Sequence, residues 1–380
     1  MRAPAPRLRK DWPILAIYLA LAAAACEIDE GGLQVVTGGT GGYKVDARAD
    51  GAIPDVPISN DIPDGAADEP DPMDTPASDD ASDDASDDAS DVPTPADVVS
   101  VDTGPPVCQH CAAYGAPKSL GLISPVLHEL SGLAASRVHP GILYGHNDSG
   151  DSARFFALDQ TAQISAELDL PGATATDWED IAMGPCAVGS CVYLSDTGDN
   201  DVNRKQYTIY RVAEPETLPT GGASINVTYE AFPFVYPDGP HNAESLLVDP
   251  QTGRVFIVLK EANVSAPVYE LPLPLQANTV VTVVKVATLS LPASAGLVTA
   301  GSFHPCSDRI LIRTKLALYE LTRPANGDLV SVFGGTFMTV PVAVEPQGEA
   351  AEYRPDGLGY YTSSETANGI TPALSAYACQ

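Results

Sequence analysis

The 380-residue sequence predicts an all-β protein, a β-propeller of five blades preceded by a disordered stalk. From about residue 112 onward, short apolar runs alternate with Pro, Gly, Asn and Asp, and the 3.6-residue period of long helices is absent. A unit of about 50 residues then repeats five times. Residues 27–105, in contrast, are acidic and nearly free of aromatic side chains, so they bury too little apolar surface to fold.

The first 26 residues have the pattern of an export signal. A basic segment containing Arg2 and Lys10 precedes a short apolar run over residues 14–21, and small residues then lead to Cys26. The apolar run is shorter than the about 20 residues that a membrane span needs. The pattern resembles the lipobox of bacterial lipoproteins, which implies a signal peptide over residues 1–25, lipidation of Cys26 and a place in the cell envelope, at the outer membrane or cell surface. Ordinary secretion with cleavage after Ala-x-Ala is the alternative.

The next segment, residues 26–105, is predicted to be an extended acidic stalk. Residues 27–105 carry 21 acidic and two basic side chains, and the tetrapeptide Ala-Ser-Asp-Asp repeats over residues 77–91. Repulsion among these carboxylates keeps such a chain extended, and calcium binding by the paired aspartates is the alternative. The whole chain has a net charge of −30. Nucleic acid is therefore not an expected partner, because phosphate recognition needs clustered Lys and Arg.

The folded domain is predicted over residues 106–380, and its cysteines favour disulfides. An even number of cysteines in an exported chain is typical of a disulfide framework. Cys186 and Cys191 flank a four-residue turn and are expected to pair with each other. The pairing of the other four stays open: Cys108, Cys111, Cys306 and Cys379. A redox or zinc role for the Cys-Gln-His-Cys motif is the alternative, although no second Cys-x-x-Cys accompanies it.

Each repeated unit is predicted to be one four-stranded blade. The fifth unit ends at Gln380 without a fourth strand, and residues 118–123 form a spare strand at the other end of the domain. We expect this spare strand to complete the last blade and close the ring, because closure removes a bare sheet edge. A sixth blade is the alternative, since one interval between units spans 65 residues and leaves room for a further hairpin after Asn226.

Acidic residues recur at two fixed places in the units. The inner strand begins with Glu in four units, and the second strand ends with an acidic residue in four. Because inner strands line the channel of a propeller, we expect these side chains to meet at one of its mouths. The predicted metal-binding or ligand-binding residues are Glu129, Asp148, Glu179, Asp196, Glu244, Glu261, Glu349 and Glu365, and the fourth unit leaves a gap in the ring at Thr299 and Lys315.

Three interpretations of these acidic residues, which together would form an acidic funnel at the channel mouth, stay open. Clustered carboxylates repel one another unless protons, a metal ion or hydrogen bonds compensate, and hard oxygen ligands suit calcium. Carboxylates with shifted pKa values also serve as general acids or bases. In the structural interpretation, the glutamates accept hydrogen bonds from backbone amides and hold the blades together. The sequence contains no nucleophile elbow, P-loop or His-Glu-x-x-His motif.

Several strings resemble a group of uncharacterised secreted bacterial propellers, which is more distantly similar to the esterase-like phytase domain family. They are Glu-Leu-Ser-Gly-Leu at 129–133, His-Asn-Asp-Ser-Gly-Asp at 146–151, Asp-Trp-Glu-Asp-Ile-Ala at 177–182 and Ser-Asp-Thr-Gly-Asp-Asn at 195–200. The resemblance covers about residues 120–378. The phytase similarity implies calcium-assisted phosphoester hydrolysis, whereas residues 106–380 carry only 14 basic side chains against 28 acidic ones.

The expected function is that of a surface-anchored lipoprotein whose propeller binds a divalent cation and, with it, a ligand or protein partner at the acidic funnel. Calcium is the expected cofactor, and the membrane is an expected partner through the lipid anchor. One alternative is a metal-dependent phosphoester or ester hydrolase that uses the same carboxylates. The other is a structural or adhesive surface protein.

Overall fold

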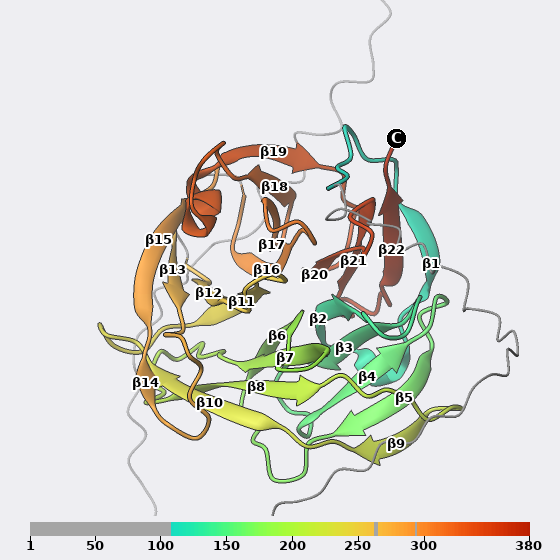
Figure 1. The fold of residues 1–380 in the computed structure, drawn as a ribbon. Helices are drawn as coiled ribbons and strands as arrows, with labels where there is room; N and C mark the ends of the chain where they lie inside the picture. The colour runs from blue at the N-terminus through green and yellow to red at the C-terminus, as the bar shows by residue number, and fades with distance from the viewer. Residues whose placement is uncertain (1–107, 262–264, 293–294) are drawn as a thin grey trace, which may run out of the picture. The chain divides into compact units, whose positions relative to one another are not determined.

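The computed structural model describes residues 108–261, 265–292 and 295–380, which form a β-propeller of five blades (Figure 1). The predicted fold class is therefore confirmed. The predicted signal peptide, Cys26 and the stalk to residue 105 lie outside the described residues. Helical structure within the described ranges is limited to two short 3-10 helices, η1 (Pro125–Leu127) and η2 (Leu329–Gly334). No helix in this part of the chain is long and apolar enough to span a membrane.

Each blade is an antiparallel sheet of four strands, ordered outward from the centre. Blade 1 consists of β2 (Leu130–Ala135), β3 (Leu143–Asn147), β4 (Arg154–Leu158) and β5 (Ile164–Asp169). Blade 2 consists of β6 (Trp178–Pro185), β7 (Ser190–Asp196), β8 (Tyr207–Ala213) and β10 (Glu230–Val235). Blade 3 consists of β11 (Ala243–Val248), β12 (Val255–Leu259), β13 (Ser265–Glu270) and β15 (Val284–Ser290). Blade 4 consists of β16 (Val298–Phe303), β17 (Arg309–Thr314), β18 (Leu318–Thr322) and β19 (Thr336–Val340).

Blade 5 closes the ring as the sequence predicts. It consists of β20 (Gly348–Tyr353), β21 (Gly359–Ser364), β22 (Ala373–Ala378) and, as its outermost strand, β1 (Lys118–Leu122) from the start of the domain. Strand β1 pairs antiparallel with β22, and the pairing continues beyond it, where the Ile123 amide donates to the Pro372 carbonyl at 3.0 Å. Both ends of the domain are thus tied into one sheet.

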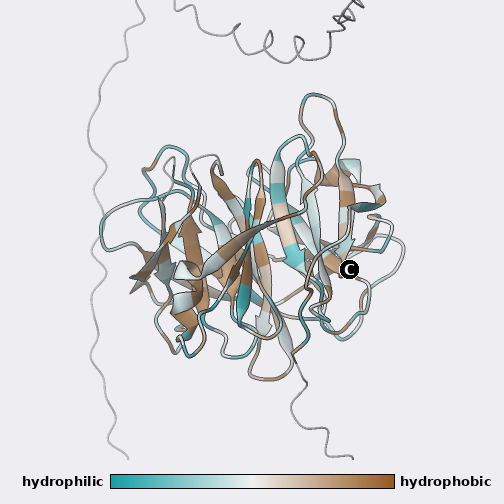
Figure 2. Cartoon of the chain, turned by 90° about the horizontal axis from the view of Figure 1, so that it is seen from above, coloured by the Kyte–Doolittle hydropathy of each residue, from teal (hydrophilic) through white to brown (hydrophobic). Residues whose placement is uncertain are grey.

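The hydrophobic core is divided among the blade interfaces. Five buried clusters occur, and each packs the facing sides of two neighbouring blades. The inner strands β2, β11, β16 and β20 are buried along their whole length, since neighbouring blades cover both of their faces. In Figure 2 the hydrophobic residues form brown segments along the strands.

Of two extra strands at the rim, the first lies in the long interval that suggested a sixth blade, and the second lies in the interval after it. Strand β9 (Ala223–Asn226) leaves blade 2 and pairs parallel with β5 of blade 1. Strand β14 (Val281–Thr282) leaves blade 3 and pairs parallel with β10 of blade 2. The chain therefore uses the additional residues to tie adjacent blades together, and the six-blade alternative is wrong.

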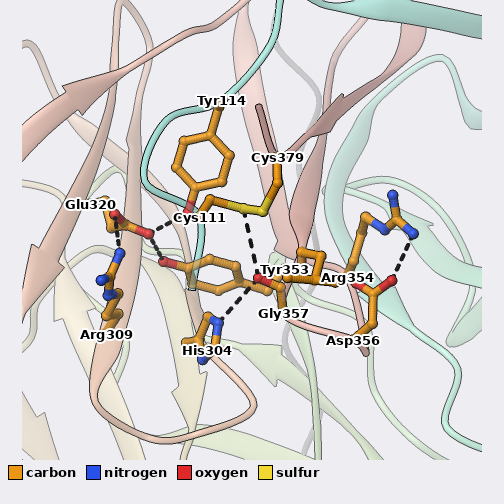
Figure 3. The surroundings of a disulfide bond; sticks show 11 residues. Cys111, Tyr114, His304, Arg309, Glu320, Tyr353, Arg354, Asp356, Gly357 and Cys379 are labelled. Atoms are coloured by element: carbon orange, nitrogen blue, oxygen red, sulfur yellow. Dashed lines mark hydrogen bonds and ion pairs between the residues drawn. A yellow bond between two sulfur atoms is a disulfide. The ribbon is translucent and has the colours of Figure 1, made fainter. Parts of the chain in front are cut away.

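Three disulfides cross-link the domain, and disulfides as a class are thus confirmed. Cys186 pairs with Cys191 across the hairpin between β6 and β7. For the four cysteines whose pairing the sequence leaves open, Cys108 pairs with Cys306 and Cys111 pairs with Cys379. Figure 3 shows the Cys111–Cys379 bond. Each cysteine of the Cys-x-x-Cys motif thus bonds a distant partner. The segment before β1 is consequently fixed to blades 4 and 5.

Candidate functional site

A charged cavity of about 260 Å³ lies where the five inner strands converge. It contains six of the eight acidic residues in the predicted series, together with two lysines and two amide side chains. Its lining residues are Glu129, Asp148, Glu179, Asn200, Glu244, Lys260, Lys315, Gln347, Glu349 and Glu365. We call this cavity the central funnel.

A β-bulge in each inner strand determines which side chain leaves the ladder of paired residues. The bulged residues are Glu244 in β11, Thr299 in β16 and Glu349 in β20, whereas β6 has a wider bulge that contains Glu179. In β2 the bulged residue is Ser131. The blade 1 member of the predicted inner series is therefore displaced by two residues, because the alignment of the units matched Glu129 with the other glutamates, whereas the bulge in β2 lies at Ser131.

Glu129 nevertheless reaches the funnel from a different position. It precedes β2, and 45% of its side-chain surface is exposed. Ser131, which takes the equivalent place in β2, donates its hydroxyl to the Glu179 carbonyl of blade 2 at 2.5 Å. Thr299 likewise donates to the Gly348 carbonyl of blade 5 at 3.0 Å and does not line the cavity. The uncharged bulge residues therefore join neighbouring blades, and Thr299 does not form an opening in the ring.

The structure leaves two predicted residues outside the funnel lining, Asp196 and Glu261. Asp196 is buried, forms an ion pair with Arg204 at 2.8 Å and accepts a hydrogen bond from the Asp177 amide at 3.1 Å. Glu261 is 36% exposed and lies 3.9 Å from His241. Asp196 thus supports the segment that carries Asp177, while Glu261 is a peripheral residue.

Two lysines neutralise one side of the funnel. Lys260 forms an ion pair with Glu244, and Lys315 lies 3.6 Å from Glu349. Burial raises the pKa of Glu349 to about 7, and the nearby Lys315 charge opposes that rise. The sequence analysis did not select Lys260, because the acidic series drew attention to the adjacent Glu261.

Three carboxylates lie close together at the funnel, two of which line the cavity while the third, Asp177, is not among its lining residues. One oxygen atom from each of Asp148, Asp177 and Glu179 lies within 4.8 Å of the other two. We call these three residues the carboxylate triad. Within the described ranges, no Lys or Arg side chain forms an ion pair with any of them. The predicted series does not include Asp177, although Asp177 is the first residue of the string at 177–182 on which the resemblance rests.

Burial and mutual repulsion shift the protonation of the carboxylate triad. Burial raises the pKa of Glu179 well above its ordinary value, and the charges of Asp148 and Asp177 raise it further. Burial, followed by the Asp148 charge, raises the pKa of Asp177 to about 7. Burial also raises the pKa of Asp148. The folded protein therefore resists placing three negative charges here unless a cation accompanies them.

The chain makes room for the carboxylate triad with a glycine. Gly198 donates its amide to the Asp177 carbonyl at 3.1 Å, and a Cβ at this position would overlap both the Glu179 and the Asp177 carboxylates. Glu179 is only 2% exposed, and its Oε1 atom has no hydrogen-bond partner among the described residues. A buried carboxylate oxygen without a partner is uncommon and requires an explanation.

Comparisons with known proteins assign no family to this chain. No protein-family model matches the sequence, and no curated protein matches it. Among solved structures, the chain is similar to the crystal structure of a mitotic checkpoint complex, with 12% identity and a TM-score of 0.32, over 65% of this chain and 63% of that chain. The comparisons do not support the resemblance to secreted bacterial propellers or to the esterase-like phytase family. The structure supports only the propeller arrangement.

Other buried acids serve the structural role that the sequence analysis considered for the predicted series. Asp180, which is 1% exposed, accepts hydrogen bonds from the amides of Leu246 in blade 3 and Gly301 in blade 4. Glu352 accepts from the Ala135 amide at 3.0 Å and from the Ser302 hydroxyl at 2.6 Å. These two residues join the inner strands of different blades, and neither belongs to the predicted series.

Proposed function

We propose that the central funnel binds a divalent cation, foremost calcium, through Asp148, Asp177 and Glu179, and with it a ligand or protein partner. The observation that carries this proposal is the buried Oε1 atom of Glu179, which has no hydrogen-bond partner among the described residues and lies beside the Asp177 carboxylate. Burying an ionised carboxylate without compensation costs several kcal/mol. A bound cation would supply the missing contact and would relieve the repulsion within the carboxylate triad.

The spacing and chemistry of the carboxylate triad support calcium as the ion. Calcium–oxygen bonds are about 2.3–2.6 Å long, so two oxygens on one ion lie no more than about 5 Å apart. The three carboxylate oxygens meet this condition, since each is within 4.8 Å of the others. Asn200 and Gln347 also line the funnel and offer amide oxygens. This all-oxygen set favours a hard cation.

A ligand with an anionic group is the second part of the proposal. Lys260 and Lys315 line the funnel, but Glu244 and Glu349 already pair with them, and six carboxylates line the cavity in all. An anionic group would therefore bind only after a cation at the carboxylate triad has reduced this negative charge, and it would contact the cation itself.

Calcium is expected to stabilise the purified chain, and a chelator is expected to destabilise it. At a hundredfold excess over the dissociation constant, binding to the folded state alone adds about 2.7 kcal/mol to the free energy of unfolding. Asp177→Asn and Glu179→Gln should each remove the calcium-dependent rise in melting temperature, since each removes one ligand charge with little change in shape. Differential scanning calorimetry with and without calcium measures this effect.

Glu261→Gln is the matched control for these two variants. It makes the same change of charge at a residue that the sequence predicts and the structure places outside the funnel. The control should respond to calcium as the unaltered chain does. If calcium leaves the unaltered chain unchanged while Glu179→Gln lowers its melting temperature, Glu179 has a structural role and the cation proposal is wrong.

We further propose that the propeller is held at the cell envelope through a lipid on Cys26, at the outer membrane or the cell surface. The proposal rests on the sequence pattern around Cys26, which lies outside the described residues. Cys26→Ser should move the protein from the membrane fraction to the soluble fraction. Unchanged partitioning of this variant into detergent would contradict the anchor.

A further inference from the structure

A second cluster of ligating side chains lies at the other end of β16 from its Thr299 bulge. One ligand atom from each of His110, His304, Asp308 and Cys306 lies within 4.8 Å of the others. His110 Nε2 is 2.8 and 3.0 Å from the two Asp308 oxygens, and His304 Nδ1 is 3.7 Å from one of them. Cys306 is bonded to Cys108, so its sulfur is not a thiolate ligand.

The disulfides determine where His110 lies. It stands between Cys108 and Cys111, which are bonded to Cys306 and Cys379, respectively. These two bonds hold the segment against blades 4 and 5, where the His110 ring stacks on His304 with ring centroids 4.8 Å apart. Figure 3 shows His304 close to the Cys111–Cys379 bond and beside Tyr353. The cluster is therefore assembled from two chain segments that the covalent framework brings together.

Hydrogen bonding orients the His304 ring for coordination. Its Nε2 atom lies 3.2 Å from the Gly357 carbonyl, and a carbonyl can only accept, so Nε2 carries the proton. Nδ1 then carries the lone pair, which accepts a weak hydrogen bond from the Cys306 amide at 3.2 Å that a metal ion would displace. A backbone carbonyl that fixes the tautomer of a histidine is the usual outer-shell partner of a metal-bound imidazole.

We propose that His110, His304 and Asp308 form a binding site for a divalent transition-metal ion such as zinc, separate from the central funnel. Two imidazoles and one carboxylate are a donor set for zinc, nickel or copper, whereas calcium prefers oxygen ligands alone. Ligand atoms in a tetrahedral zinc site lie about 3.4 Å apart. Asp308 Oδ1 lies 3.0 Å from His110 Nε2 and 3.7 Å from His304 Nδ1, on either side of this value.

The surroundings of this site permit a metal ion to enter and to be retained. The side chains of His110 and Asp308 are 24% and 31% exposed, so an ion reaches them from solvent and a fourth ligand position stays open. Arg309 is the nearby cation, and Glu320 neutralises it through an ion pair at 3.1 Å. The bound ion would link the segment before β1 to blade 4 and would stabilise the closed ring.

Zinc should therefore raise the melting temperature of the full, disulfide-bonded chain. At a hundredfold excess over the dissociation constant the rise should be about 5 °C relative to the chain in chelator. His110→Ala and Asp308→Asn should each abolish the rise. His139→Ala is the control, because His139 belongs to neither cluster and its ring contacts the Pro215 carbonyl. Asp177→Asn should keep the zinc response, since Asp177 belongs to the carboxylate triad and not to this cluster.

Cobalt provides a readout that does not depend on stability. Cobalt(II) bound by imidazole and carboxylate ligands in a four-coordinate site gives visible ligand-field absorption, which His110→Ala should lose and His139→Ala should keep. A zinc response that survives in His110→Ala and disappears in Asp177→Asn would overturn the proposal, because the ion would then occupy the funnel. Absence of both the zinc shift and the cobalt band in the unaltered chain would overturn it as well.

Discussion

A chain that begins at Leu127 is expected to lose about 3 kcal/mol or more of unfolding free energy relative to one that begins at Ala116. The shorter chain lacks β1, whose removal exposes the edge of β22 and deletes the buried side chain of Ile123. Burial of one such side chain contributes about 1.5–3 kcal/mol, and the lost ladder hydrogen bonds add to this. The total stability of a domain is typically about 5–15 kcal/mol, so the effect is large.

Both shortened chains lack Cys108 and Cys111, so replacing Cys306 and Cys379 by Ser in both makes the comparison depend on residues 116–126 alone, of which β1 is the main part. Urea denaturation measures the difference in stability. The chain that begins at Leu127 should also self-associate more strongly, because an unpaired edge strand is a template for pairing. Equal denaturation midpoints for the two chains would show that β1 does not close the ring in solution.

Asp180→Ala is expected to destabilise the propeller by at least about 3 kcal/mol. The Asp180 carboxylate accepts from the amides of Ile181, Leu246 and Gly301, at 2.9, 2.9 and 3.2 Å. Alanine would leave three buried donors without a partner, and each such donor costs about 1–3 kcal/mol. The loss should appear in urea denaturation as a lower midpoint with an unchanged slope.

Two variants show whether this loss comes from the hydrogen bonds. Asp180→Asn keeps one acceptor oxygen and similar volume, so it should cost much less than alanine. Asp201→Ala removes an exposed acid from the same blade and should change stability by less than about 0.5 kcal/mol. If Asp180→Ala denatures at the same urea concentration as Asp201→Ala, Asp180 does not join the inner strands as described.

The sequence predicts the fold well because each blade repeats the same local pattern. Residues 118–123 were recognisable as the closing strand because the fifth unit lacks its fourth strand. The pairing of the short rim strands β9 and β14 with a neighbouring blade could not be predicted. Such contacts depend on how blades pack, and no repeat in the sequence records them.

The position of the funnel followed in part from the recurrence of acidic residues at matching places in the units. Six of the eight predicted residues line one cavity, and Asp196 and Glu261 do not. The bulge in β2 lies at Ser131, two residues after Glu129, and an alignment of acidic residues could not locate it. Asp177 lies outside the repeated positions and reaches Glu179 through the local course of the chain. Spacing alone therefore could not assemble the carboxylate triad.

Calorimetric titration of the full chain with calcium tests the central claim most directly. The unaltered chain and Glu261→Gln should each bind one more calcium ion per chain than Asp177→Asn does, because only the last variant alters the carboxylate triad. Any calcium bound by the acidic residues 27–105 would be common to all three proteins and would cancel in this comparison. Equal calcium stoichiometry and affinity in the unaltered chain and in Asp177→Asn would contradict the proposed site.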